Sequence, residues 1–297
     1  MQRSMVRAMP SVFVLIWSTG FVVARLAMPH SPPFSFLSVR FALSALCFFA
    51  WIALARAAWP VGRAQWGHLA ITGVLMQAGY LGGVWAAVKA GIGAGTVALL
   101  VGLQPVLTAL WVTVTLPRAA AAGKAAGRVT IREWLGLLLG LSGLALVVWP
   151  KLGTGEVTPA NLALAIVALL GITTGTLYQK RFVAPCDVRS AGAVQMLAAL
   201  IVCAPLAWFE REPMDWHANL VAAMSWSVGV LTLGGSSLLY LLIQRGEATA
   251  VTSLLYLVPP CTALMAWLLF GETFTPLMTL GMALTVAGVA IVVRERR

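Results

Sequence analysis

Aromatic and hydrogen-bonding residues recur at helical spacing in two apolar stretches, where they could bind a ring-bearing ligand. Side chains three or four residues apart share one face of a helix. In the stretch 68–88 one such face holds Gln77, Tyr80, Leu81 and Val84, with Trp85 at its edge. In the stretch 220–244 the corresponding face holds Ser236, Ser237 and Tyr240. Flat rings beside one or two polar groups are the expected lining of a small-molecule pocket; the alternative is that these residues only hold helices together.

Two further apolar stretches, 9–27 and 160–179, add candidate lining residues. The first contributes Trp17 and Phe21, and the second contributes Thr174 and Tyr178. Trp and Tyr also gather at membrane interfaces. Trp17 and Tyr240 lie deeper in their stretches than an interface position requires, which favours a cavity for these two.

Proline lies in the middle of the apolar stretches 94–116 and 248–271. The residues are Gln104-Pro105 in one and Pro259-Pro260 in the other. Proline removes a backbone donor and frees a carbonyl, which inside a bilayer needs neighbouring groups or a water-lined cavity. The matched positions predict paired gates, with Gly20 and Gly175 as further hinge positions. A static kink that shapes the bundle is the alternative.

Enzymatic chemistry has little support in the sequence. His30, His68 and His217 lie at the ends of apolar stretches or in loops, without a carboxylate at catalytic spacing. Motifs of zinc hydrolases, serine hydrolases and phosphate-binding loops are absent. The four cysteines form no C-x-x-C pair, which argues against a metal site or a disulfide frame. We therefore expect a protein that is not an enzyme and that uses neither cofactor nor metal.

Charged residues avoid the interiors of the apolar stretches. All nine Asp and Glu residues lie at ends or in loops, whereas proton relays and cation sites in membranes usually depend on an internal carboxylate. A facilitator of neutral or zwitterionic solutes therefore fits better than a proton antiporter for cations. Arg40 is the strongest candidate for a charged residue inside the membrane. It could attract a substrate carboxylate, but a structural role, bonding backbone carbonyls or headgroups, is favoured.

The composition places these stretches in a membrane. Of 297 residues 60% are apolar and only 10% are charged, against about 25% charged in soluble domains. The mean hydropathy is +0.92. A spanning helix needs about 20 mostly apolar residues. The chain divides into ten apolar runs, namely 9–27, 35–55, 68–88, 94–116, 134–150, 160–179, 190–209, 220–244, 248–271 and 277–293. These runs predict an all-α integral membrane protein with ten transmembrane helices.

The basic residues predict the orientation of the chain. Alternate assignment of the loops puts fifteen of the 20 Lys and Arg residues on the side that holds both termini. Because cytoplasmic loops carry the excess of basic residues, both termini are expected in the cytoplasm. The net charge of +11 is thus a topology signal, since the basic residues sit singly between apolar runs and form no patch for nucleic acid.

The two halves of the chain repeat each other at an offset of 155 residues. This offset pairs Gly20 with Gly175, Arg40 with Gln195, Trp85 with Tyr240 and Pro105 with Pro260. Residues 1–117 and 133–150 form the first expected repeat, around a basic cytoplasmic loop at 118–132, and residues 160–293 form the second. Five spans in each half require the second copy to enter the membrane from the opposite side. Such inverted-topology repeats are typical of secondary transporters.

Several short motifs carry a family resemblance. The second half contains Glu247-Ala-Thr-Ala-Val, Leu257-Val-Pro-Pro, Phe270-Gly-Glu, Leu280-Gly and Ala287-Gly-Val, and the first half opens with Ile16-Trp-Ser-Thr-Gly-Phe followed by Arg40. The chain thereby resembles the EamA-type permeases of the drug/metabolite transporter superfamily, and within it most resembles the exporters of aromatic amino acids (YddG-like). Leu116-Pro117 stands where the first module would have its Gly-Glu pair, so the halves have diverged.

The residues and the resemblance together predict an exporter of aromatic and other apolar amino acids, and of drug-like solutes, in the bacterial cytoplasmic membrane. It would work by alternating access. The expected partners are the small-molecule substrate and the lipid bilayer, with a monomer sufficient and a dimer as the alternative. The substrate ring would stack on Trp17, Tyr80, Trp85, Tyr240 or Tyr256, and its polar end would bond to Gln77, Gln104, Ser236 or Ser237.

Three alternatives to amino-acid export stay open at this point. A proton-coupled exporter of lipophilic drugs or metabolites is the first, because an aromatic lining does not distinguish a drug from an amino acid. A nucleotide-sugar permease would need more cationic residues near the cavity than Arg40 and Lys89. A membrane scaffold or lipid-modifying enzyme is the third.

Overall fold

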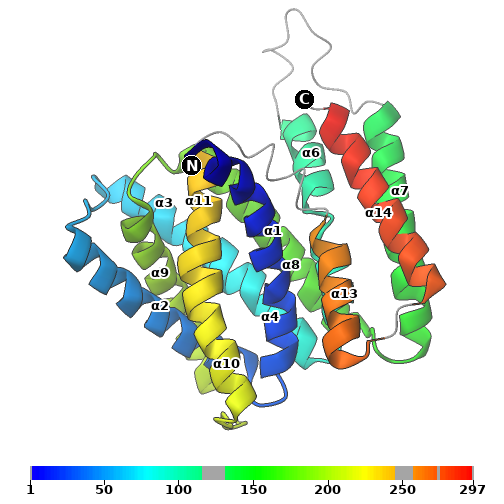
Figure 1. The fold of residues 1–297 in the computed structure, drawn as a ribbon, viewed down its shortest axis with the longest axis horizontal. Coiled ribbons are helices and arrows are strands. Elements are labelled where there is room, and N and C mark those ends of the chain that lie inside the picture. The colour runs from blue at the N-terminus through cyan, green and yellow to red at the C-terminus, as the bar shows by residue number, and fades with distance from the viewer. Residues whose placement is uncertain (1, 116–130, 245–256, 273–274, 296–297) are drawn as a thin grey trace, which may run out of the picture.

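The computed structural model describes residues 2–115, 131–244, 257–272 and 275–295, and this part of the chain contains helices and no strand (Figure 1). The prediction of an all-α chain is confirmed for these residues. In chain order the elements are α1 (Gln2–Ala27), α2 (Pro33–Ala55), α3 (Arg63–Gly73), η1 (Val74–Leu81), α4 (Gly82–Lys89), α5 (Ala94–Val101), α6 (Gln104–Thr115), α7 (Ile131–Gly153), α8 (Pro159–Phe182), α9 (Val188–Trp208), α10 (Ala218–Trp226), η3 (Ser227–Ser236), α11 (Ser237–Gln244), α13 (Val258–Phe270) and α14 (Pro276–Glu295).

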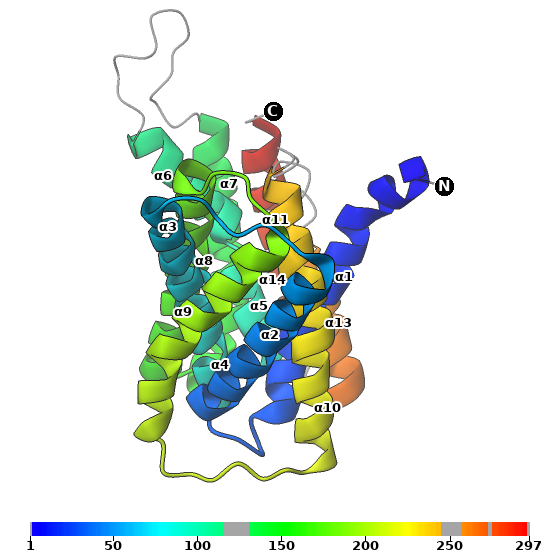
Figure 2. The ribbon, with the colours of Figure 1, turned by 90° about the vertical axis from the view of Figure 1, so that its left-hand side faces the viewer.

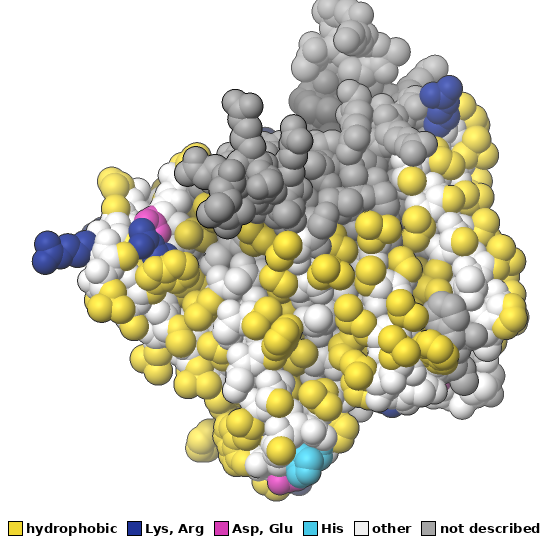
Figure 3. Space-filling model, viewed as in Figure 1, with side chains coloured by type: hydrophobic (Ala, Val, Ile, Leu, Met, Phe, Trp, Pro, Cys, Tyr) yellow, Lys and Arg dark blue, Asp and Glu magenta, His cyan; other side chains and the backbone are white. Residues whose placement is uncertain are grey.

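Six helical stretches are long and apolar enough to cross a membrane, judged by length and composition. They are Pro33–Ala55, Arg63–Lys89, Trp134–Leu152, Pro159–Phe182, Val188–Trp208 and Ala218–Leu241. Four shorter apolar helical stretches accompany them, at Val12–Ala27, Ala94–Thr108, Val258–Phe270 and Pro276–Gly288, of which the second joins α5 to the start of α6 across a break. Figure 3 shows hydrophobic side chains across the middle of one face and charged ones toward its edges. An apolar surface of this extent fits contact with lipid.

The helices form a bundle whose two ends differ (Figures 1 and 2). Helix α1 begins and α14 ends at the same end, which we call the terminal end. The other end, the far end, holds the loops 28–32, 90–93, 154–158 and 209–217. Most of the expected basic loop at 118–132 and residues 248–256 of the ninth expected run lie outside the described residues.

Local sequence signals explain several helix boundaries. Helix α8 begins with a reciprocal capping box, in which Thr158 and Asn161 each accept a hydrogen bond from the other's backbone N–H. Asp187 caps α9 by accepting from the backbone N–H of Arg189. Helix α13 ends at Gly271, whose φ of 63° suits a residue without a Cβ atom.

Two of the helical stretches contain π-helical segments, which the sequence analysis did not predict. Segment η1 connects α3 to α4, and η3 connects α10 to α11. The hydroxyl of Thr232 donates to the carbonyl oxygen of Ser227, five residues earlier, at 2.9 Å. Residues 74–81 of η1 and 229–236 of η3 are separated by 155 residues, which is the offset found in the sequence. π-Helical segments occur frequently at functional sites.

The prolines that were expected to kink two helices lie at helix starts. A break between two helices precedes Pro105, and Pro259 and Pro260 lie at the start of α13. Helix α5 ends at Val101 and α6 begins at Gln104, so Pro105 lies in the first turn of α6 and not inside a continuous helix. Pro259 and Pro260 lie in the first turn of α13. Proline is tolerated there because the first N–H groups of a helix have no partner within it. A Cβ atom on Gly102 would come within 2.7 Å of the Pro259 ring, so the break in the first stretch packs directly against the start of α13.

Glycine allows two long helices to pack very closely. Helices α7 and α14 make the most extensive helix contact in the described part of the chain, followed by α2 and α9. A Cβ atom on Gly143 would collide with the carbonyl oxygen of Gly281, and one on Gly288 would collide with that of Gly136. Only hydrogen fits at these positions, as expected where small residues let helix backbones approach.

Candidate functional site

A cavity lies between the helices and opens to solvent. Its walls come from α1, α2, η1, α4, α8, α9, η3 and α11. The lining residues are Trp17, Gly20, Phe21, Arg40, Met76, Gln77, Tyr80, Leu81, Val84, Trp85, Gln179, Gln195, Leu231, Ser236, Leu239 and Tyr240. Apolar rings and aliphatic chains dominate this list, with a few amide and hydroxyl groups and one charge.

Arg40 supplies the one charge among these lining residues. Its side chain is buried, with 3% of the residue exposed. Nε and Nη2 donate to Oγ1 of Thr232 at 3.2 and 3.1 Å, and the guanidinium carbon lies 5.9 Å from the centre of the Trp85 ring. Within the described residues it forms no salt bridge with a carboxylate. A buried charge without a counter-charge is costly, so this side of the cavity would gain from an anionic group.

The aromatic side chains of the cavity pack against other aromatic rings. The rings of Trp17 and Tyr80 lie nearly parallel, with an interplanar angle of 4° and centres 6.1 Å apart. Trp85 is almost fully buried and stacks on Phe36, with ring centres 4.3 Å apart. Packed in this way, the rings form a rigid apolar wall that suits a planar ligand.

Neutral polar groups complete the lining. Gln77, Gln179 and Gln195 line the cavity, and the hydroxyl of Ser236 donates to the carbonyl oxygen of Leu231 at 3.4 Å. The side-chain nitrogen of Gln195 is buried without a hydrogen-bond partner in the described part of the chain. The Tyr240 hydroxyl lies 3.0 Å from Sγ of Cys186. These groups can orient a ligand through hydrogen bonds without adding charge.

Ten of the sixteen lining residues form five pairs separated by 155 residues. The pairs are Arg40 and Gln195, Met76 and Leu231, Leu81 and Ser236, Val84 and Leu239, and Trp85 and Tyr240. The two halves of the chain therefore contribute equivalent positions to one cavity. Within three pairs the chemistry differs. The cation Arg40 corresponds to an amide, Leu81 corresponds to a serine, and Trp85 corresponds to a tyrosine.

The cavity brings together most of the residues that the sequence singled out. Nine expected substrate-binding residues line it: Trp17, Phe21, Gln77, Tyr80, Leu81, Val84, Trp85, Ser236 and Tyr240. Gly20, expected as a hinge, also lines it, where a Cβ atom would lie 3.7 Å from Leu231. Their role in binding stays a prediction.

Four expected binding residues do not line the cavity. Gln104 donates to Oγ1 of Thr176 at 3.1 Å, Tyr178 is hydrogen bonded to Nδ1 of His68 at 2.8 Å, and Thr174 donates to the carbonyl oxygen of Leu170 at 2.7 Å. The Ser237 hydroxyl is buried and has no partner among the described residues. Tyr256 lies outside those residues. Gly175, an expected hinge, packs against the side chain of Met76.

The helices that form the walls differ in part from those expected. The sequence predicts a site lined in part by the stretches 94–116 and 248–271. Among the described residues, the lining contains none from α5, α6 or α13 and includes Arg40 from α2 and Gln195 from α9. The offset of 155 could have found Gln195, Leu231 and Leu239, since their equivalents were already candidates or neighbours of candidates. Gln179 could have been found in the same way, since the offset pairs it with Ala24, one turn after the candidate Phe21.

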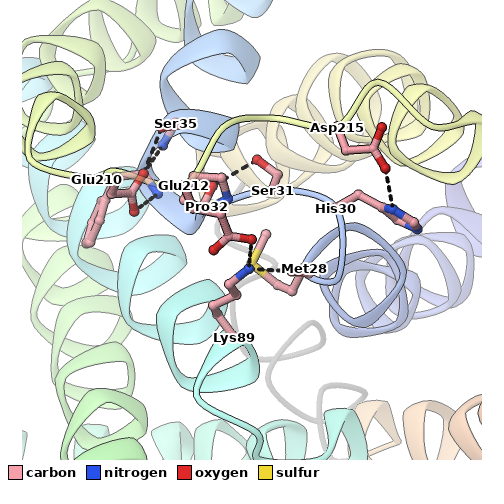
Figure 4. Close-up of polar contacts among 10 residues, drawn as sticks. Met28, His30, Ser31, Pro32, Ser35, Lys89, Glu210, Glu212 and Asp215 are labelled. Carbon is pink, nitrogen blue, oxygen red and sulfur yellow. Dashed lines mark hydrogen bonds and ion pairs between the residues drawn. The ribbon is translucent and has the colours of Figure 1, made fainter.

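At the far end of the bundle, the loop 209–217 binds two neighbouring segments (Figure 4). Lys89 Nζ donates to Oε1 of Glu212 at 2.6 Å and to the carbonyl oxygen of Met28 at 3.0 Å. Glu210 accepts from the backbone N–H groups of Phe34 and Ser35 at 2.9 and 2.7 Å, at the start of α2. These contacts fasten the loop to α2 and α4, and so hold the far end together.

A second group of charged residues lies at the far end, beside the start of α5. Glu156 accepts from the backbone N–H of Gly93 at 3.2 Å and from Lys151 Nζ at 2.6 Å. Glu272 accepts from the backbone N–H of Ala94 at 3.1 Å. Carboxylates are stabilised at the start of a helix by its unpaired N–H groups and its dipole. All of these acidic groups lie away from the cavity lining.

Apolar helices of membrane length around a polar and aromatic cavity define a polytopic membrane protein with a candidate site for a small solute. The sequence profile of the EamA-like transporter family matches residues 11–149 and 160–294. The chain therefore belongs to the EamA-like transporter family, within the drug/metabolite transporter superfamily.

Curated relatives are similar along nearly the whole chain. The "Uncharacterized inner membrane transporter YedA" of Escherichia coli K12 is 27% identical over 286 residues, which cover 94% of this chain and 87% of the relative. The "Probable amino-acid metabolite efflux pump" of Salmonella typhimurium is 24% identical over 288 residues, covering 94% and 91%. Together with the apolar helices, these similarities identify the protein as a membrane transporter of the inner membrane.

A solved structure shares the fold. A chain described as "Crystal structure of protein" matches with a TM-score of 0.66 at 20% identity, covering 97% of this chain and 98% of the other. At this level of identity the match concerns the fold alone.

Proposed function

We propose that the protein exports aromatic and other apolar amino acids across the bacterial cytoplasmic membrane. The observation that carries this proposal is a cavity with aromatic walls and one buried cation, Arg40, that has no acidic partner in the described part of the chain. The substrate ring would pack against Trp17, Tyr80 and Trp85, while its carboxylate would bond to Arg40. The name of the Salmonella relative, an amino-acid metabolite efflux pump, agrees with this class of cargo.

Ten membrane-spanning helices in two inverted five-helix repeats are the architecture that we propose for transport. The family profile matches the chain twice, once in each half. Five pairs of lining residues and the two π-helical segments share the offset of 155 residues. Two equivalent units around one site can exchange roles, so that the site opens to each side of the membrane in turn.

We further propose that the described conformation is closed to the outside. The far end is fastened by the contacts of Lys89, Glu210 and Glu156. The lining includes Gln179 near the end of α8 and Tyr240 in α11, both toward the terminal end. The positive-inside rule assigns the terminal end, with its excess of Lys and Arg, to the cytoplasm. A cytoplasmic amino acid would then enter from this end.

Facilitated transport is the proposed mode, without coupling to protons. The lining has no Asp, Glu or His in the described residues, and a proton-coupled site usually contains such a group. An exporter without coupling moves solute down its gradient, which suits the removal of an amino acid that has accumulated in the cell.

Counterflow in proteoliposomes that contain only the purified protein tests the proposal. We expect radiolabelled Phe, Trp and Tyr to exchange faster than in empty vesicles, and a pH gradient to leave the rate unchanged. Trp17→Ala should reduce the exchange, whereas Trp149→Ala, on the exposed surface of α7, serves as the matched control. Absence of flux for all three amino acids contradicts the substrate class. Acceleration by a pH gradient contradicts facilitation and favours the proton-coupled alternative.

A further inference from the structure

We infer that the cavity recognises hydrophobic monocarboxylates as a class, and that an α-ammonium group plays no part in this recognition. The inference rests on the proposed function and states which chemical group of the substrate the site recognises. It extends the cargo from aromatic amino acids to their counterparts that lack the amino group, such as aryl-propionates and aryl-2-oxo acids.

The first argument is the charge of the cavity. Arg40 is the only charged side chain among the lining residues that the structure describes. The carboxylates of Glu156, Glu210 and Glu212 are bound to backbone N–H groups or lysine at the far end. A carboxylate that enters the cavity therefore gains a counter-charge, whereas an ammonium group meets one cation and no anion among the lining residues that the structure describes. An ion desolvated without a counter-charge is penalised.

The second argument is the bonding capacity of Arg40. A guanidinium group has five N–H donors. Nε and Nη2 both donate to one neutral oxygen, the hydroxyl of Thr232, and none of the described residues accepts a hydrogen bond from Nη1. The position beside the Trp85 ring leaves the group able to form charge-assisted bonds with a carboxylate that arrives from the cavity.

The third argument is the asymmetry between the two halves of the chain. Gln195 is separated from Arg40 by 155 residues and lines the same cavity, yet it is neutral. The equivalent position thus supplies neither a second cation for a dicarboxylate nor an anion for an ammonium group. The amides of Gln77 and Gln179 are neutral as well and can both donate and accept. They suit an amino, oxo or hydroxyl substituent without selecting among them.

Three ligands of matched shape test the inference. L-Phenylalanine carries both charges at pH 7, 3-phenylpropionate carries only the carboxylate, and phenethylamine carries only the ammonium group. Each competes with tritiated phenylalanine for the purified protein in detergent and in proteoliposomes. We expect 3-phenylpropionate to compete within about threefold of phenylalanine, and phenethylamine to be weaker by about thirtyfold or more, as for loss of one partner of a buried charge pair.

Arg40→Gln and Arg40→Lys identify the group responsible. The neutral variant should remove the preference for 3-phenylpropionate over phenethylamine, so that their ratio falls to near one, while the lysine variant should keep much of it. Direct binding of radiolabelled 3-phenylpropionate is measured in parallel, and a single symmetric elution peak shows that each variant is folded. A preference that survives in Arg40→Gln overturns the inference, as does a wild-type protein that prefers phenethylamine.

The same measurements separate this inference from the proposed function. Phenylalanine exchange without competition by 3-phenylpropionate overturns the inference and leaves amino-acid export standing. Binding of 3-phenylpropionate that depends on Arg40, without any exchange of phenylalanine, supports the monocarboxylate class and overturns amino-acid export. If the wild-type protein binds none of the three ligands, both are overturned.

Discussion

Arg40 and Thr232, on opposite halves of the chain, are joined by two hydrogen bonds inside the cavity wall. Nε and Nη2 of Arg40 lie 3.2 and 3.1 Å from the Thr232 hydroxyl oxygen. That hydroxyl in turn donates to the carbonyl oxygen of Ser227 at 2.9 Å. The cation of α2 is thus positioned by the π-helical segment η3, so two cavity walls are linked through a single hydroxyl group.

Removal of this hydroxyl should weaken substrate binding. Thr232→Val keeps the shape of the side chain but removes the acceptor of Arg40, so we expect the half-saturating concentration of phenylalanine in counterflow to rise by about three- to tenfold, which corresponds to the net contribution of one ordinary hydrogen bond. Thr232→Ser keeps the hydroxyl and should stay within about twofold of wild type. A loss in Thr232→Ser together with wild-type behaviour of Thr232→Val would mean that the methyl group, and not the hydroxyl, matters.

Much of the fold can be predicted from the sequence because hydropathy decides which segments are buried in lipid. The expected runs 35–55 and 190–209 correspond closely to α2 and α9, at Pro33–Ala55 and Val188–Trp208. Helical spacing also identifies the cavity-facing arc around Tyr80, because residues on one face of a helix share an environment. The π-helical segments could not be predicted, since apolar patterning does not distinguish a backbone with i−5 hydrogen bonds from an α-helix.

The cavity itself depends on how helices cross, which hydropathy does not determine. Gln104 and Tyr178 are polar or aromatic residues in apolar runs, like Gln77 and Tyr80, yet each bonds to a neighbouring helix or side chain outside the lining. Arg40 is the opposite case, because it was not expected to bind substrate and yet lines the cavity. An isolated cation inside a helix suggests a structural role, and only the tertiary arrangement puts it in the lining beside Trp85.

The contact between α7 and α14 should be sensitive to a single methyl group. A Cβ atom on Gly288 would collide with the carbonyl oxygen of Gly136, so Gly288→Ala must push the helices apart. We expect a loss of about 1–3 kcal/mol, as for overpacked interiors, seen as a lower unfolding temperature in detergent. Gly229→Ala is the control, because nothing lies within 4 Å of its added Cβ atom. Equal unfolding temperatures for the two variants would contradict the close contact.

We expect the ion pair of Lys89 and Glu212 to favour the conformation with a closed far end, and to contribute little to the stability of the fold. Both side chains are partly exposed, so the pair contributes at most about 1 kcal/mol. Lys89→Glu should nevertheless release the loop 209–217 and open the far end. We expect faster labelling of a cysteine placed at Leu81, in a cysteine-free background, by a membrane-impermeant maleimide added on the far-end side.

The charge-reversed pair provides the control for this prediction. Lys89→Glu combined with Glu212→Lys restores an attractive contact and should bring labelling back toward the wild-type rate. Identical labelling in wild type, single variant and double variant would show that the contact does not hold the far end closed.

The start of α9 should lose stability at low pH. Hydrogen bonds from the Arg189 side chain, at 2.9 and 2.6 Å, hold the pKa of the Asp187 carboxyl below its usual value of 3.8, assisted by the backbone N–H of Arg189. A carboxyl whose pKa is depressed in the folded state stabilises that state above its unfolded pKa, and this contribution disappears as the pH falls through the folded value. The effect is therefore constant near neutral pH and lost below about pH 4.

Asp187→Asn isolates the charge, because asparagine is an equally good helix cap. At pH 7 we expect the variant to be less stable by about 0.2–1 kcal/mol, the range of partly exposed ion pairs, in thermal unfolding of the purified protein. The difference from wild type should shrink as the pH is lowered below 4, since protonation removes the same charge from Asp187. Asp187→Ala loses the cap as well and should stay less stable than Asp187→Asn at every pH. A gap between wild type and Asp187→Asn that does not change with pH would assign the stabilisation to the cap geometry, with no contribution from the ion pair.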